Sequence, residues 1–169
     1  HASCRRWIEA YEIKVPLSLL SQGHLLFEGV SATHLTTYFE VPVGDHVNEI
    51  AQVLGQKREQ RQFGIKVRTG GTTVPTSQLL ADFLHGALSN GLRVKATQGL
   101  HHPITQGKEF GFVNFFASLT FAERQGWDSN MIRQCLEEED PKTFSFEVDS
   151  FSWRSYRITC EALEASKAV

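Results

Sequence analysis

Charged side chains recur at alternate positions in four segments that otherwise have the composition of buried strands. These segments are residues 11–15, 38–41, 63–69 and 92–97, and their polar members are Glu12, Lys14, Glu40, Lys66, Arg68, Lys95 and Thr97. Successive side chains of a strand point to opposite faces, so the charged residues share one face and neighbours such as Ile65 and Val67 share the other. Because desolvating an ionised group is costly, charges on a packed face are usually paired or used. The pattern therefore predicts a polar interior shaped for a ligand.

Cationic groups near the ends of two of these strands predict an anion site. Functional groups of parallel α/β folds gather at the carboxyl ends of the strands. Lys66 and Arg68 are predicted to hold a carboxylate or phosphate beside the start of the next helix, in a binding site that also includes Glu40, Thr69, Thr97 and the Gly70-Gly71 turn. The alternative is that Arg68 pairs with Glu40 or Glu12 in a structural network, because buried charges are usually paired.

Lys95 and the adjacent histidines are the candidates for proton transfer. Lys95 lies between Val94 and Ala96, where burial and nearby cations would favour a neutral amine able to act as a base or Schiff-base nucleophile. A structural ion pair with a strand carboxylate is the alternative. One imidazole of His101 and His102 could serve as general acid or base, and adjacent side chains in an extended loop point in opposite directions. Only one of the two is therefore expected to reach the pocket.

The sequence offers one further polar candidate for the pocket and predicts neither a metal ion nor a nucleotide cofactor. Asn114 falls in the first turn of a predicted helix and either points toward the pocket or occupies the surface. A metal site would need Glu40, Glu12 or Asn114 as ligands, and the surrounding cations oppose a dication, so no metal is predicted. The sequence contains no Walker-type loop and no G-x-G-x-x-G turn, so no nucleotide cofactor is expected.

Composition limits the partners and the compartment. The chain has 169 residues and a formal net charge of -2, which gives no general attraction to nucleic acid or to an anionic membrane. Any anion site must therefore be local. Three widely spaced cysteines predict free thiols in a reducing cytoplasm. The longest apolar runs fall well short of the roughly 20 residues that span a bilayer.

Strand and helix signals alternate through the centre of the chain. One helix is predicted after a cap at Asp45, and a second begins at residues 75–77 and ends at Asn90-Gly91. A third begins at Phe112, and its buried stripe consists of Phe112, Phe115, Phe116, Leu119 and Ala122. A fourth runs from a cap at Ser129 and is ended by Pro141, and a fifth covers residues 161–168. A further strand is predicted over 144–148 from its alternation of apolar and polar residues.

This order predicts a single α/β domain over residues 1–169. We expect about five mainly parallel strands with right-handed helical crossovers, resembling a half (βα) barrel. A closed eight-stranded barrel normally needs about 250 residues, so the sheet stays open and covered or two chains complete each other. Because a half-sized unit exposes a sheet edge, a homodimer or larger homo-oligomer is expected.

Three sequence blocks also carry a resemblance. Residues 65–71 (IKVRTGG), 94–103 (VKATQGLHHP) and 111–114 (GFVN) together resemble an uncharacterised bacterial family with RTGG, KATxGLHHP and HGFxN blocks. The resemblance covers residues 38–153, corresponds to the second half of longer members, and implies no activity. Where the family has His before Gly-Phe, this chain has Phe110. The short form also suits an environmental integron-cassette protein.

Two functions are compatible with these residues. The first is a lyase or isomerase for a small anionic metabolite, in which Lys66 and Arg68 hold the acid group while Lys95 with His101 or His102 moves protons. The second is a non-catalytic binding or assembly module with a degenerate pocket, favoured by Phe110 and by the missing half of the longer family members.

Overall fold

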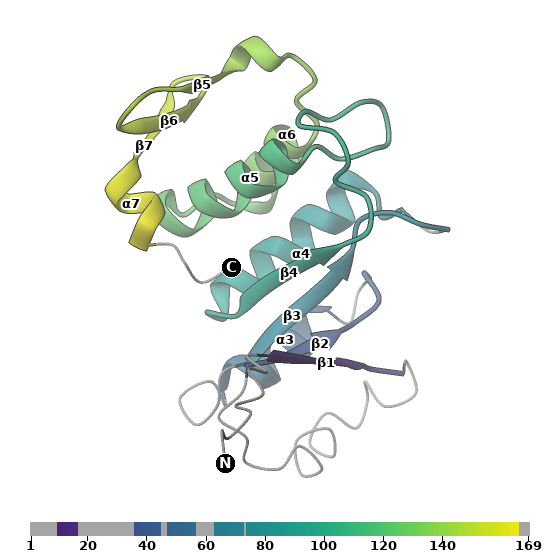
Figure 1. The fold of residues 1–169 in the computed structure, drawn as a ribbon. Coiled ribbons are helices and arrows are strands. Elements are labelled where there is room, and N and C mark those ends of the chain that lie inside the picture. The colour runs from purple at the N-terminus through teal and green to yellow at the C-terminus, as the bar shows by residue number, and fades with distance from the viewer. Residues whose placement is uncertain (1–9, 17–35, 45–46, 57–62, 73, 166–169) are drawn as a thin grey trace, which may run out of the picture.

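Four parallel strands form the main sheet. The computed structural model describes residues 10–16, 36–44, 47–56, 63–72 and 74–165 (Figure 1). The strands are β1 (Ala10–Lys14), β2 (Thr36–Glu40), β3 (Phe63–Arg68) and β4 (Arg93–Thr97), and they pair in the order of the chain. Helices α3 (Val47–Gln56) and α4 (Ser77–Ser89) connect β2 to β3 and β3 to β4. The protein therefore has the predicted α/β fold.

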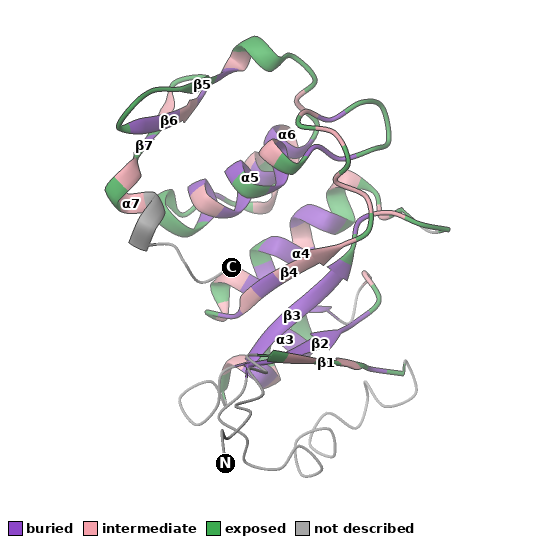
Figure 2. Ribbon diagram, in the orientation of Figure 1, coloured by how far each residue is buried: buried purple, intermediate pink, exposed green. Residues whose placement is uncertain are grey.

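The two connecting helices lie on the apolar face of the sheet. They pack against each other and against their neighbouring strands. Phe39, Ile65, Val67 and Val94, which share this face by alternation, are almost fully buried. In Figure 2 the ribbon of β3 is coloured as buried along most of its length. Because apolar residues alternate with charged ones, the opposite face of the same strands carries the polar side chains.

Helix α4 has the boundaries that its sequence predicts. The Thr76 hydroxyl accepts a hydrogen bond from Leu79 N at 3.2 Å, which caps the first turn. At the other end Gly91 has φ 65°, and Leu92 N donates to Ala87 O at 3.0 Å, as in a left-handed helix termination. The Asp45 cap predicted for α3 lies outside the described residues.

The second half of the chain differs from the prediction. After α5 (Phe112–Gln125) and α6 (Ser129–Leu136), a 3₁₀ turn (Pro141–Thr143) leads into β5 (Phe144–Phe146), β6 (Ser150–Trp153) and β7 (Tyr156–Thr159). These strands form a separate antiparallel sheet, so the strand predicted over 144–148 exists in part but is not parallel, and β6 and β7 were not predicted. Helix α7 (Cys160–Ala165) closes the described chain.

Two helix signals also had a different role. The cap of α6 is Asp128, whose carboxylate accepts from Met131 N at 2.9 Å, whereas Ser129 is the first helical residue. Pro141 begins the 3₁₀ turn, where a proline can stand without losing a hydrogen bond, and α6 has already ended.

Aromatic residues join the antiparallel sheet to α5. The ring of Phe121 stacks on Trp127 with centroids 4.8 Å apart and also contacts Phe151 and Tyr156. One continuous hydrophobic cluster includes side chains from both sheets. The predicted stripe on α5 is only partly buried, because Phe112 and Phe116 are exposed. Among the described residues, no helix is long and apolar enough to cross a membrane.

Candidate functional site

The register of the main sheet brings the predicted charged residues together. Glu40 lies beside Lys66 on adjacent strands, and Lys66 lies beside Lys95 on the next strand. Their side chains share the face of the sheet opposite the helices. Residues from four segments of the sequence therefore form one polar surface, as their alternation predicted.

A chain of ion pairs runs across this surface. Lys66 Nζ contacts Glu12 Oε2 and lies 2.8 Å from Glu40 Oε2, while Arg68 Nε donates to Glu40 Oε1 at 2.7 Å. Lys95 Nζ lies 2.7 Å from Glu12 Oε1. The Lys66 side chain is only 8% exposed, whereas Arg68 is 47% exposed. The network therefore has a buried centre and a solvent-accessible arginine at one end.

These contacts shift the ionisation of the central groups. Hydrogen bonds from Lys66 and Lys95 lower the pKa of Glu12, and the hydrogen bond from Arg68 does the same to the pKa of Glu40. Burial opposes the charged form of Lys66, but its hydrogen bonds to both carboxylates prevail and raise its pKa above the usual value. Both carboxylates and the lysine are therefore held in their charged forms.

The environment of Lys95 matches the structural alternative. Its amine pairs with Glu12, lies 5.5 Å from the centre of the Tyr38 ring and belongs to a side chain that is 42% exposed. A neutral amine would need burial without a facing carboxylate. The geometry thus favours an ion-paired lysine over a basic nucleophile.

The RTGG turn joins two loops of the pocket. Thr69 Oγ1 donates to Gln98 O, and a Cβ added at Gly70 would lie 2.5 Å from Gly99 N. A Cβ at Gly99 would in turn lie 2.7 Å from Thr69 O. Gly71 has φ 95°, which confirms the predicted sharp turn. These glycines are needed because the loops after β3 and β4 touch through their backbones.

The histidines and Asn114 lie away from the charged network. His101 is exposed, and His102 Nε2 lies 2.9 Å from Glu109 Oε2. Asn114 is fully buried, so the surface position predicted for its side chain is wrong. Its amide accepts from Thr105 N at 3.0 Å and donates to Cys135 O and Glu138 O at 2.8 Å. Asn114 thus fastens the loop before α5 to the end of α6.

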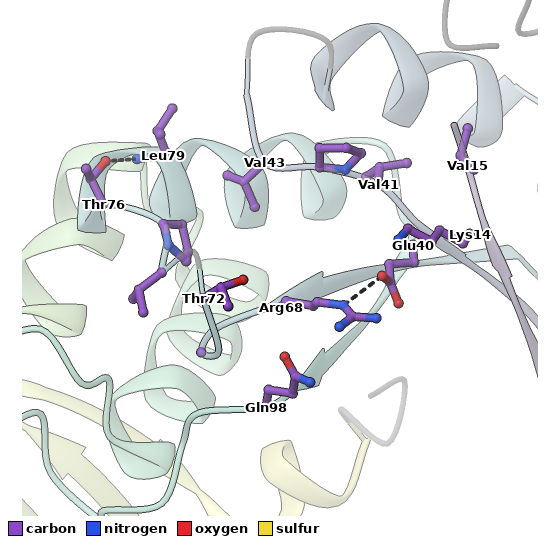
Figure 3. Close-up of a pocket in the computed structure, with 14 residues that line it drawn as sticks. Lys14, Val15, Glu40, Val41, Val43, Arg68, Thr72, Thr76, Leu79 and Gln98 are labelled. Carbon is purple, nitrogen blue, oxygen red and sulfur yellow. Dashed lines mark hydrogen bonds and ion pairs between the residues drawn. The ribbon is translucent and has the colours of Figure 1, made fainter. Parts of the chain in front are cut away.

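A pocket of about 460 Å³ lies at the carboxyl ends of the four parallel strands (Figure 3). Val15, Val41, Gly70 and Gln98, which follow β1, β2, β3 and β4, all line it. Arg68, Glu40 and Lys14 contribute charged side chains, and the remaining lining residues are Pro42, Val43, Thr72, Val74, Pro75, Thr76 and Leu79. The location is that of ligand sites in parallel α/β folds.

Arg68 is the best-placed anion ligand in this pocket. Glu40 Oε1 accepts a hydrogen bond from Arg68 Nε, and Lys66 forms an ion pair with the other oxygen of the same carboxylate. Within the described residues, the two terminal nitrogens of Arg68 have no hydrogen-bond partner. They are therefore free to bind a carboxylate or phosphate end-on while Glu40 fixes the orientation of the guanidinium.

The described strands also give this face a local positive charge. Five cations on it face two carboxylates, although the whole chain has a net charge of -2. The cations are Lys14, Lys66, Arg68, Arg93 and Lys95. In the described part of the chain, no group of three or more His, Cys, Asp or Glu side chains could hold a metal ion. The surplus of positive charge on this face suits an anionic ligand.

Sequence reasoning assigned to the site some residues that lie elsewhere and missed others that line the pocket. Lys14, Thr72 and Gln98 line it but were not predicted as ligands. Lys14 carried a usable signal, because it shares the alternating charged face of β1. The other two stand in loops, where no periodicity indicates the direction of a side chain.

Comparison with known proteins adds no relative on which to base a function. No protein-family model, no curated protein and no solved structure matches this chain. The resemblance to the RTGG family stays a prediction.

Proposed function

We propose that this protein binds a small organic anion in the pocket at the carboxyl ends of β1–β4, with Arg68 as the anchor. The observation that carries the proposal is the free end of the Arg68 guanidinium, held beside a cavity by Glu40. The cavity volume is within the range of small-molecule sites. The surplus of cations on the same face supports the sign of the ligand charge.

The geometry favours binding over the predicted lyase or isomerase chemistry. Neither His101 nor His102 lines the pocket, and Lys95 is paired with Glu12. Glu40 does line the pocket, but the pKa of its carboxyl group is lowered, mainly by the hydrogen bond from Arg68. This carboxylate is therefore a weak base. Catalysis stays a hypothesis that turnover of a bound ligand would establish, with loss of turnover in Lys95→Ala expected if that amine reacts.

Arg68→Gln tests the anchor. Isothermal titration calorimetry with small carboxylates and with inorganic phosphate should detect binding to the unchanged protein. The variant should weaken Kd at least about tenfold, because a charge-assisted hydrogen bond contributes roughly 1.5–3 kcal/mol. Arg157→Gln, which alters an exposed arginine on β7, is the matched control and should bind normally. Equal affinity in Arg68→Gln and the unchanged protein would contradict the proposal.

A further inference from the structure

The walls of the Arg68 pocket differ sharply in chemistry. In Figure 3 Arg68, Thr72 and Gln98 lie along one side, and Val43 and Leu79 lie along the other. The apolar lining comes from two segments: Val41, Pro42 and Val43 after β2, and Val74, Pro75 and Leu79 before and within the first turn of α4, where Thr76 is the polar exception. A ligand held at Arg68 would therefore meet a polar edge and an apolar wall together.

The apolar lining of the pocket exposes hydrophobic side chains to water, which is unfavourable in free energy. Val74 and Leu79 are among the exposed large hydrophobic residues of the described chain, and both line the pocket. They differ in this from Leu80, Phe83 and Leu84 of α4, which are fully buried. Covering such side chains with a hydrocarbon group releases water and is favourable. The body of the ligand should therefore be apolar and not hydroxylated.

The charged end favours a monoanion. Only one guanidinium edge is free, and Glu40 lines the same pocket with its charge shared between Arg68 and Lys66. Of the other charged groups on the lining, Glu40 repels a second negative charge on the ligand and Lys14 attracts it, so the Arg68 edge alone sets the preference for one charge. Two parallel N–H groups of Arg68 match the two oxygens of a carboxylate.

We infer that the ligand of this pocket is a small carboxylate with an apolar tail, of the short-chain or branched-chain acyl type. The carboxylate binds Arg68, and the tail lies against Val43, Val74 and Leu79. This inference rests on the proposed function, because it takes Arg68 as the anchor. It goes further by excluding phosphorylated and sugar-like ligands as the preferred class.

A homologous series tests the inference. Acetate, propanoate, butanoate and pentanoate, with inorganic phosphate and glycerol phosphate as polar anions, should be titrated by calorimetry. Each added methylene should tighten Kd about three- to fourfold. Pentanoate should therefore bind more tightly than either phosphate. In Leu79→Gln this gain should shrink while acetate affinity is kept. Val148→Gln, which changes a fully exposed residue outside the pocket, should behave like the unchanged protein.

The outcomes separate the two proposals. Binding that needs Arg68 but does not depend on tail length, or that is strongest for the phosphates, would overturn the apolar-tail inference and leave the anion site standing. Affinities that stay unchanged in Arg68→Gln across the whole series would overturn the role of the carboxylate and of the anchor. No measurable binding of any probe would overturn both.

Discussion

At the scale of single residues, the centre of the molecule is Lys66 between two carboxylates. Its amine contacts Glu12 and Glu40, and each carboxylate has a second cationic partner, Lys95 or Arg68. Removing one partner from such a buried group leaves uncompensated charge, which costs more than the pair itself contributes. The network therefore fixes the position of Arg68, and the anion site depends on it.

The network predicts a specific dependence of stability on pH. The folded pKa values of Glu12 and Glu40 lie below the usual 4.5, so their contribution is present above about pH 4.5 and is lost as the pH falls through the folded values. The pKa of Lys66 lies above 10.5, so its contribution is present below about pH 10.5 and is lost at more alkaline pH. Stability should be highest between these limits.

Glu40→Gln tests this dependence by urea unfolding. At about pH 6 the variant should lose about 2 kcal/mol of unfolding free energy, because Lys66 and Arg68 lose a shared partner. Between about pH 6 and about pH 3 its stability should then fall less than that of the unchanged protein. Glu123→Gln, at an exposed position on α5, should keep the original slope. Parallel pH profiles for Glu40→Gln and the unchanged protein would contradict the assignment.

At the scale of elements, close backbone contacts explain the sequence blocks that stand out. Gly70 and Gly99 let the loops after β3 and β4 touch, and Thr69 links them through the Gln98 carbonyl. Asn114 joins the loop before α5 to the end of α6 in the same way. Thr69, Gly70 and Gly99 therefore shape the pocket without contacting the free end of Arg68, whereas Asn114 holds a loop that does not line it.

Gly70→Ala tests the contact between the two loops. The new Cβ would lie 2.5 Å from a backbone nitrogen that cannot swing aside, so the loops must separate. We expect a loss of about 1–3 kcal/mol in unfolding free energy, as for other overpacked sites, and weaker ligand binding. Gly44→Ala is the matched control, because a Cβ there meets nothing within 4 Å. A neutral effect of Gly70→Ala would show that the loops are not held together at this point.

At the scale of the whole molecule, the main sheet keeps an open edge. In the described chain β4 pairs only with β3, and residues of β4 line a cavity of about 310 Å³ together with Tyr38, Leu100, Phe115 and Phe116. Phe116 and the neighbouring Phe112 are exposed aromatic residues on α5. Unpaired strand edges and apolar surface are features of interfaces. They support the predicted homodimer, which stays a proposal.

Light scattering tests the assembly. The 19.0 kDa chain should give about twice that mass at micromolar concentration, and Phe116→Ser should shift the population toward monomer because it removes apolar surface beside the open edge. Phe146→Ser, at an exposed aromatic residue on β5, is the matched control and should leave the mass unchanged. A monomeric mass for the unchanged protein would contradict the proposal.

The sequence by itself determined the α/β class, the parallel strands and the polar face of the sheet. Alternation in β1–β4 is a local property of a strand, so Lys66 and Arg68 could be placed on one face without knowing their neighbours. The boundaries of α4 were equally local, since Thr76 and Gly91 act within a single turn.

Only the tertiary structure decided what each charge does. Whether Lys95 would be neutral or paired depended on Glu12, which is distant in sequence and reaches it through the strand register. The antiparallel sheet of β5–β7 and the burial of Asn114 depended on packing against α5 and α6 in the same way. Partners that meet only after folding leave no period in the sequence, and for this reason the apolar part of the pocket lining was not predictable from it.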